Sequence, residues 1–106
     1  MNSFDVTLPD GKVLTLKPLS ASRETNRLYG ATSPQGKDES VLGSQSYIDS
    51  IYDVCDKLFT LNGIDAETIY GQFTNTGLIG WYFEQIFIGC FGMSVDATDN
   101  SKKKGR

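Results

Sequence analysis

The sequence predicts an α+β domain that is mainly α, with an N-terminal β-hairpin followed by three to four helices and a disordered C-terminal tail. Three patterns predict it. Apolar and polar residues alternate in residues 3–17, apolar residues recur at helical spacing over 46–61, and an apolar, aromatic stretch covers 76–93. A chain of 106 residues supports one compact domain. We therefore expect a single small domain at 1–95 and a disordered tail at 96–106.

The predicted hairpin over residues 3–17 has an apolar face. Apolar residues occupy every second position on both sides of a turn: Phe4, Val6 and Leu8 before it, Leu14 and Leu16 after it. Pro9-Asp10-Gly11 supplies the turn, because proline fixes φ and glycine accepts a positive φ. A lone hairpin is marginally stable in water, so we expect its apolar face to rest on the helices.

The segment after the hairpin is predicted to be a short helix over residues 20–29, with Ser20 or Ser22 as its N-cap and Gly30 as its end. Residues 30–43 then combine small, polar and charged residues with a proline, which is typical of a flexible connector. This connector is longer than most, so we expect it to be either mobile or a binding loop.

The clearest predicted helix extends from about Ser46 to Leu61, within a helical part that spans residues 44–93. Its apolar residues lie three or four positions apart: Tyr47, Ile51, Val54, Cys55, Leu58 and Leu61. Asn62-Gly63 is a fitting end for this helix. A short helix over residues 66–70, capped by Asp65, is expected to follow.

A second face of the long helix carries Asp49, Asp53 and Asp56. Such a row can hold a divalent cation or simply face water. Carboxylates at i and i+4 on a straight helix do not form the oxygen cage that calcium prefers, so we interpret the row as a solvated acidic face.

The last predicted helix, about residues 76–93, is apolar on two sides. One stripe consists of Ile79, Tyr82, Phe83, Ile86, Cys90 and Met93, and the second consists of Leu78, Trp81 and Ile88 with Phe87 and Phe91 beside it. Three interpretations are open: a central core helix, a helix with one face at an interface, and a membrane span. Glu84, near the middle of this stretch, weighs against a membrane span, because inserting a charged side chain at the bilayer centre costs at least ~2.5 kcal/mol.

The interface interpretation defines a candidate binding site for another copy or for a partner chain. Large aromatic and apolar side chains are the types that anchor protein interfaces. The expected partner-binding residues are Leu78, Trp81, Tyr82, Phe83, Phe87, Ile88 and Phe91.

The composition argues against several classes of function. Four of the ten Lys and Arg residues lie in residues 102–106, which leaves six bases against thirteen acids in residues 1–101, a net charge of −7. Nucleic acid is therefore not an expected partner. The chain has no histidine, no phosphate-binding glycine loop and no cluster of metal ligands. We expect no enzyme, no cofactor, no metal site and no small-molecule substrate.

Cysteine usage and the N-terminal sequence indicate the cellular compartment of the protein. Cys55 and Cys90 each lie in apolar sequence without a second cysteine nearby, so both are predicted to be buried thiols in a reducing compartment. Residues 1–5 show no basic region followed by an apolar run, so we expect no secretory signal. These observations predict an intracellular protein.

The order of elements resembles the small tail assembly chaperones of long-tailed phages and prophages of Gram-positive bacteria. The resemblance covers about residues 4–93: the hairpin with Pro-Asp-Gly, the polar connector, the amphipathic helix over residues 47–59 and the apolar final helix. The link between the last two helices is similar to the family's, with Ile64, Ile69, Tyr70, Gly71 and Phe73 in corresponding places and Gln72 as an added residue. The final helix is more aromatic and richer in glycine than the family's pattern.

The resemblance implies an assembly chaperone in the cytoplasm of a bacterial host cell. Such a chaperone coats the long, helical tape measure protein while a tail tube assembles, and it leaves before the virion is complete. Self-association is also expected. The alternatives are a small structural tail or head–tail connector protein that stays in the virion, and a small membrane-active protein that uses residues 77–93.

Overall fold

The computed structural model describes residues 3–34 and 36–92, and its first feature is the predicted hairpin. Strand β1 (Phe4–Thr7) pairs antiparallel with β2 (Val13–Leu16), with Phe4 opposite Leu16 and Thr7 opposite Val13. Gly11 has a φ of +92°, which an L side chain rarely adopts. Its N–H donates to the Leu8 carbonyl at 2.8 Å and closes the turn. The hairpin prediction is confirmed.

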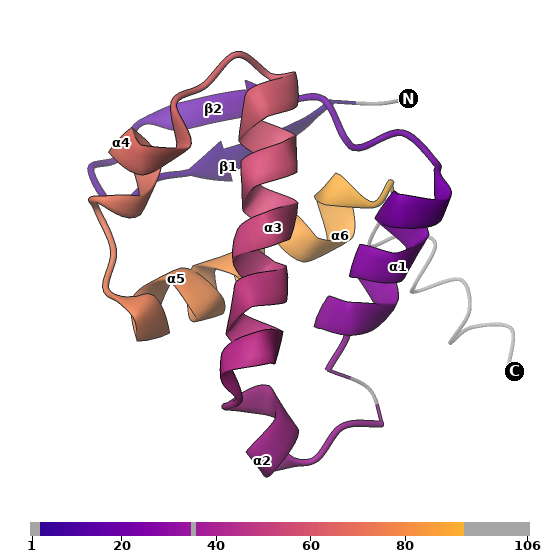
Figure 1. Ribbon diagram of the computed structural model, residues 1–106. Helices are drawn as coiled ribbons and strands as arrows, with labels where there is room; N and C mark the ends of the chain where they lie inside the picture. The colour runs from indigo at the N-terminus through magenta and orange to yellow at the C-terminus, as the bar shows by residue number, and fades with distance from the viewer. Residues whose placement is uncertain (1–2, 35, 93–106) are drawn as a thin grey trace, which may run out of the picture.

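Helices make up most of the rest, so the prediction of a mainly α, α+β fold is confirmed. In chain order they are α1 (Arg23–Thr32), α2 (Glu39–Leu42), α3 (Gln45–Leu61), α4 (Ala66–Tyr70), α5 (Asn75–Trp81), the π-helical turn η1 (Tyr82–Ile86) and α6 (Phe87–Cys90). Figure 1 shows α3 passing through the middle, with the hairpin near its C-terminal end and α1 beside it. The described residues contain no helix that is both long enough and apolar enough to cross a membrane.

The N-cap of α1 is Ser22, one of the two predicted, but the predicted helix end at Gly30 and the predicted connector bounds were wrong. The helix begins after Ser22, whose side chain accepts a hydrogen bond from the Thr25 N–H, and it passes through Gly30 to Thr32. Thr32 is fully buried, so packing of the last turn outweighs the cost of a helical glycine. The connector expected over residues 30–43 therefore contains the end of α1 and all of α2, which Asp38 caps. The tail predicted at 96–106 lies outside the described residues.

The last helical stretch runs from Asn75 to Cys90 without a break, but it is not a regular α-helix. Thr74 caps it, and its middle forms the π turn η1. This turn lies against β1. The Trp81 indole N–H donates to the Thr7 carbonyl at 2.7 Å, and the Thr7 N–H donates to the Gln85 side-chain oxygen at 3.1 Å. These bonds attach the outer edge of the hairpin to the helix.

One core joins the hairpin, α1, α3 and the last helical stretch. Its buried members from the strands and α3 include Val6, Leu16, Ile51, Val54, Cys55, Leu58 and Phe59. Those from the last stretch are Leu78, Trp81, Tyr82, Ile86 and Cys90. Most of the apolar surface of the final helix is therefore covered within the chain itself, as the core-helix interpretation expects.

The ring of Phe4 packs closely against Gly89. A Cβ atom placed on Gly89 would come within 2.4 Å of a Phe4 ring carbon, whereas a Cβ on Gly80 would meet nothing within 4 Å. The absence of a side chain at Gly89 is thus what allows the first strand to approach α6.

We expect the Gly89→Ala variant to lose about 1–3 kcal/mol of stability, because the added methyl group overpacks the Phe4 contact. Gly80→Ala, in the same helical stretch, is the matched control. It should gain about 0.5–1 kcal/mol, because alanine favours a helix over glycine and the site is open. Urea unfolding of both variants measures the difference. Equal stability changes would contradict the packing described.

Candidate binding surface

The structure divides the seven residues predicted to bind a partner into two groups. Leu78, Trp81 and Tyr82 are in the core, with exposed fractions of 1%, 8% and 0%. As a correction, these three side chains do not lie on a free surface. Trp81 lies against Phe59 of α3 and bonds Thr7 of β1, and the Tyr82 hydroxyl meets Thr32 of α1. Phe83, Phe87 and Phe91 are half-buried and Ile88 is exposed, so the candidate surface is reduced to these four.

The remaining aromatic residues form a continuous row with a residue that sequence reasoning missed. We define the aromatic row as Tyr29, Phe83, Phe87 and Phe91, all of them half-buried. Ring centroids are 5.8 Å apart for Phe83–Phe87 and 5.6 Å apart for Phe87–Phe91. Tyr29 of α1 stacks on Phe87 at 5.4 Å and meets Phe91 edge-on at 5.2 Å. Such distances are typical of favourable aromatic pairs.

Tyr29 escaped prediction because its role depends on a contact between segments far apart in the sequence. The signal available was weak: Leu28 and Tyr29 are the two sizeable apolar residues of α1, and they are adjacent. Adjacent positions on a helix point about 100° apart, so the two cannot serve the same surface. Leu28 is buried in the core and Tyr29 joins the aromatic row.

A shallow hollow of about 270 Å³ lies at one end of the row. Its lining combines two rings of the row with small and polar side chains of the start of α1: Ala21, Ser22, Thr25, Asn26, Tyr29 and Phe91. None of these six carries a charge. A hollow of this kind can accept an apolar side chain and offer hydroxyl and amide groups at its rim.

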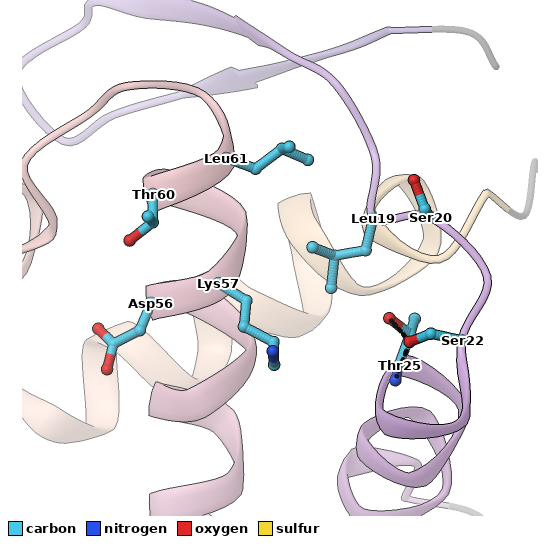
Figure 2. A pocket seen from close by; sticks show the side chains of 8 residues that line it. All are labelled: Leu19, Ser20, Ser22, Thr25, Asp56, Lys57, Thr60 and Leu61. Atoms are coloured by element: carbon cyan, nitrogen blue, oxygen red, sulfur yellow. Dashed lines mark hydrogen bonds between the residues drawn. The ribbon is translucent and has the colours of Figure 1, made fainter.

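A larger groove of about 520 Å³ separates the start of α1 from the C-terminal half of α3. In Figure 2, Leu19 lies between the two helices, Lys57 points into the gap and Asp56 points away from it. Hydrogen bonds from Arg27 lower the pKa of Glu24, and the charge of Lys57 lowers it further. Asp56 and Lys57 are the charged residues among those that line the groove.

Ser22 and Thr25 line both the groove and the hollow. Their hydroxyl groups serve the helix cap, since Ser22 accepts from the Thr25 N–H and donates to the Thr25 hydroxyl. Asp49 accepts a bond from Gln45, and Asp56 accepts one from the Tyr70 hydroxyl at 2.6 Å. Across residues 3–34 and 36–92, no group of three or more acidic, Cys or His side chains is placed to hold a metal ion.

A buried hydrogen-bond cluster positions the two helices that carry the aromatic row. The Thr32 hydroxyl bonds the Leu28 carbonyl at 2.8 Å and lies 3.0 Å from the Tyr82 hydroxyl. The Tyr47 hydroxyl donates to the Thr32 carbonyl at 2.7 Å. Thr32, Tyr47 and Tyr82 are all buried, and they come from α1, α3 and η1. We call these three residues the Thr32 cluster.

Both cysteines are buried thiols within the core, as predicted from their apolar sequence surroundings. Burial raises the pKa of Cys90 to about 12 and raises the pKa of Cys55 above its ordinary range. Burial likewise raises the pKa of the Tyr82 hydroxyl. Neither thiol is a candidate nucleophile, because only the thiolate reacts.

Neither a protein-family model, nor a curated protein, nor a solved structure matches this chain.

We expect Tyr47→Phe to cost more stability than Tyr82→Phe. The first change leaves the buried Thr32 carbonyl without its hydroxyl donor, which costs about 1–3 kcal/mol, whereas the second leaves the Thr32 hydroxyl bonded to Leu28 and costs about 0.5–1.5 kcal/mol. Urea unfolding measures both variants. The reverse order would contradict the assigned donors and acceptors.

We expect the protein to lose stability at alkaline pH. Cysteines and tyrosines of the unfolded chain ionise near 9 and 10, whereas the buried ones stay neutral in the folded state. Their raised pKa values therefore add stability that is fully present below about pH 8.5 and is lost as the pH rises further. The free energy of unfolding between pH 7 and pH 11 measures this. Rapid alkylation of both thiols in native protein at pH 8 would contradict the assigned burial.

Proposed function

We propose that this protein is an assembly chaperone that binds apolar helical segments of a longer partner, as tail assembly chaperones bind the tape measure protein. The observation that carries the proposal is the aromatic row, a run of four half-buried rings in successive contact. Exposed aromatic patches on small soluble domains commonly mark protein-binding sites. The resemblance of element order to the tail assembly chaperones supports the choice of partner.

The spacing of the row favours a helical partner. Phe83, Phe87 and Phe91 succeed one another at intervals of four residues, so the row follows the last helical stretch for about 12 Å, or roughly two helical turns. A partner helix with apolar residues at i, i+3 or i+4, and i+7 presents a stripe of similar length. The uncharged hollow beside Tyr29 and Phe91 offers a place for one such side chain.

The net charge and the lack of histidine and of a phosphate-binding glycine loop also favour a binding function over catalysis. The net charge of −7 over residues 1–101 keeps an apolar surface in solution and repels nucleic acid. We therefore propose a binding protein without catalytic activity.

The partner can be tested through the gene neighbourhood. We expect the reading frame immediately downstream to encode a very long helical protein that co-purifies with this chain when the two are co-expressed. Phe91→Asp should weaken the complex about ten-fold or more, because it places a charge in the aromatic row. Val41→Asp is the matched control. It introduces the same charge at a residue that is 41% exposed on α2, outside the row.

Circular dichroism of both variants establishes that each is folded before binding is compared. Equal loss of binding in the two folded variants, or none in Phe91→Asp, would contradict the row as the contact surface. Purified virions separate the chaperone from the structural alternative. A chaperone should be absent from them, whereas a tail or connector component should be present in stoichiometric amounts.

A further inference from the structure

The side chain of Asn62 joins the C-terminal end of α3 to the segment that follows β2 (Figure 1). Its oxygen accepts a hydrogen bond from the Lys17 N–H at 2.8 Å. Its amide group donates to the Lys17 carbonyl at 3.1 Å and to the Leu58 carbonyl at 2.8 Å. One side-chain amide thus connects the hairpin to α3 across 45 positions of sequence. We call Asn62 and its bonds to Lys17 the hairpin joint.

The residue after Asn62 is a glycine because α3 ends in a left-handed turn. Gly63 has a φ of +71°, which an L side chain rarely adopts. This turn lets the Ile64 N–H reach back to the Phe59 carbonyl at 2.9 Å, and the Gly63 N–H bonds the Thr60 carbonyl at 3.1 Å. The fold therefore requires both residues of the pair, Asn62 for the joint and Gly63 for the end of the helix.

An Asn–Gly pair can lose the side-chain amide, because glycine has no Cβ to hinder attack by its backbone nitrogen. The pair occurs once in the sequence. The Gly63 nitrogen gives up its proton and forms a bond to the side-chain carbonyl carbon of Asn62. The bond between that carbon and Nδ2 breaks, the amide nitrogen takes up a proton and leaves as ammonia, and a five-membered succinimide ring remains. Water then opens the ring to aspartate or isoaspartate.

The folded chain opposes this reaction at each reacting group. In the ring, the Gly63 nitrogen nearly eclipses the Cα–Cβ bond of Asn62, whereas at the observed ψ of 8° it nearly eclipses the Asn62 backbone nitrogen instead. The Gly63 N–H is bonded to the Thr60 carbonyl, and the leaving amide is held by the carbonyls of Lys17 and Leu58. The bonds at both groups have to break, and the backbone has to rotate, before the ring can close.

We propose that Asn62 is a deamidation site that is closed in the folded chain and reacts when the hairpin joint opens. The product cannot rebuild the joint. An ionised aspartate only accepts hydrogen bonds, so it would face the carbonyls of Lys17 and Leu58 without a donor. Isoaspartate also lengthens the backbone at the turn. The reaction therefore marks, irreversibly, chains that have opened.

The marking is independent of the proposed function, because the hairpin joint and the aromatic row share no residue. The wild-type full chain tests it. Folded chain at neutral pH should deamidate at Asn62 about ten-fold or more slowly than the same chain in guanidinium chloride, since the rate follows the population of the open form. Peptide mass mapping of residues 62 and 63 measures both rates. In guanidinium chloride, Gly63→Ala should react much more slowly, because its Cβ hinders the attack.

Asn62→Asp tests the consequence, since it carries the aspartate product. Its equilibrium constant for unfolding should exceed the wild-type value about ten-fold or more. Asn26→Asp makes the same change at an exposed residue of α1 and should stay close to wild type. The rate comparison uses the wild-type chain, so it holds even if Asn62→Asp fails to fold.

Equal deamidation rates in folded and unfolded chain would overturn the proposal, and so would an Asn62→Asp variant as stable as Asn26→Asp. Neither outcome would affect the co-purification test of the aromatic row.

Discussion

The fold depends on how the last helical stretch is fixed between α1, α3 and the hairpin. The Thr32 cluster holds it from one side, because buried hydroxyl groups of α3 and η1 meet the final turn of α1. Trp81 and Gln85 hold it from the other side through the backbone of Thr7. The buried hydroxyl groups of the Thr32 cluster would be costly if they were left unpaired. These hydrogen bonds therefore fix the position of the last helical stretch relative to α1, α3 and the hairpin.

This arrangement explains why one helix serves both as core and as candidate binding surface. Tyr82 and Ile86 fill the interior, while Phe83 and Phe87 remain at its margin. Tyr29 from α1 stacks on Phe87 and meets Phe91 edge-on, so both helical segments contribute to the row. Rings held by packing lose little conformational freedom on binding, which favours their use as anchors.

The final helix exposes less apolar surface in the folded chain than its sequence suggests. Three of the seven predicted contact residues are covered, because the last helical stretch packs against α1, α3 and the hairpin at once. The hairpin can approach closely because Gly89 has no side chain where the Phe4 ring lies. What remains at the surface is a narrow row and a hollow rather than a full helix face.

The sequence by itself determined the local elements, because their causes are local. Alternation produced the hairpin, spacings of three and four produced α3, and the caps Ser22 and Thr74 marked the starts of α1 and α5. It also determined that the final helix is apolar on two sides. The tertiary structure alone decided which of those sides is covered, carried α1 past Gly30, and brought Tyr29 to Phe87. These outcomes depend on contacts between residues about 50 or more positions apart, whose geometry no local pattern encodes.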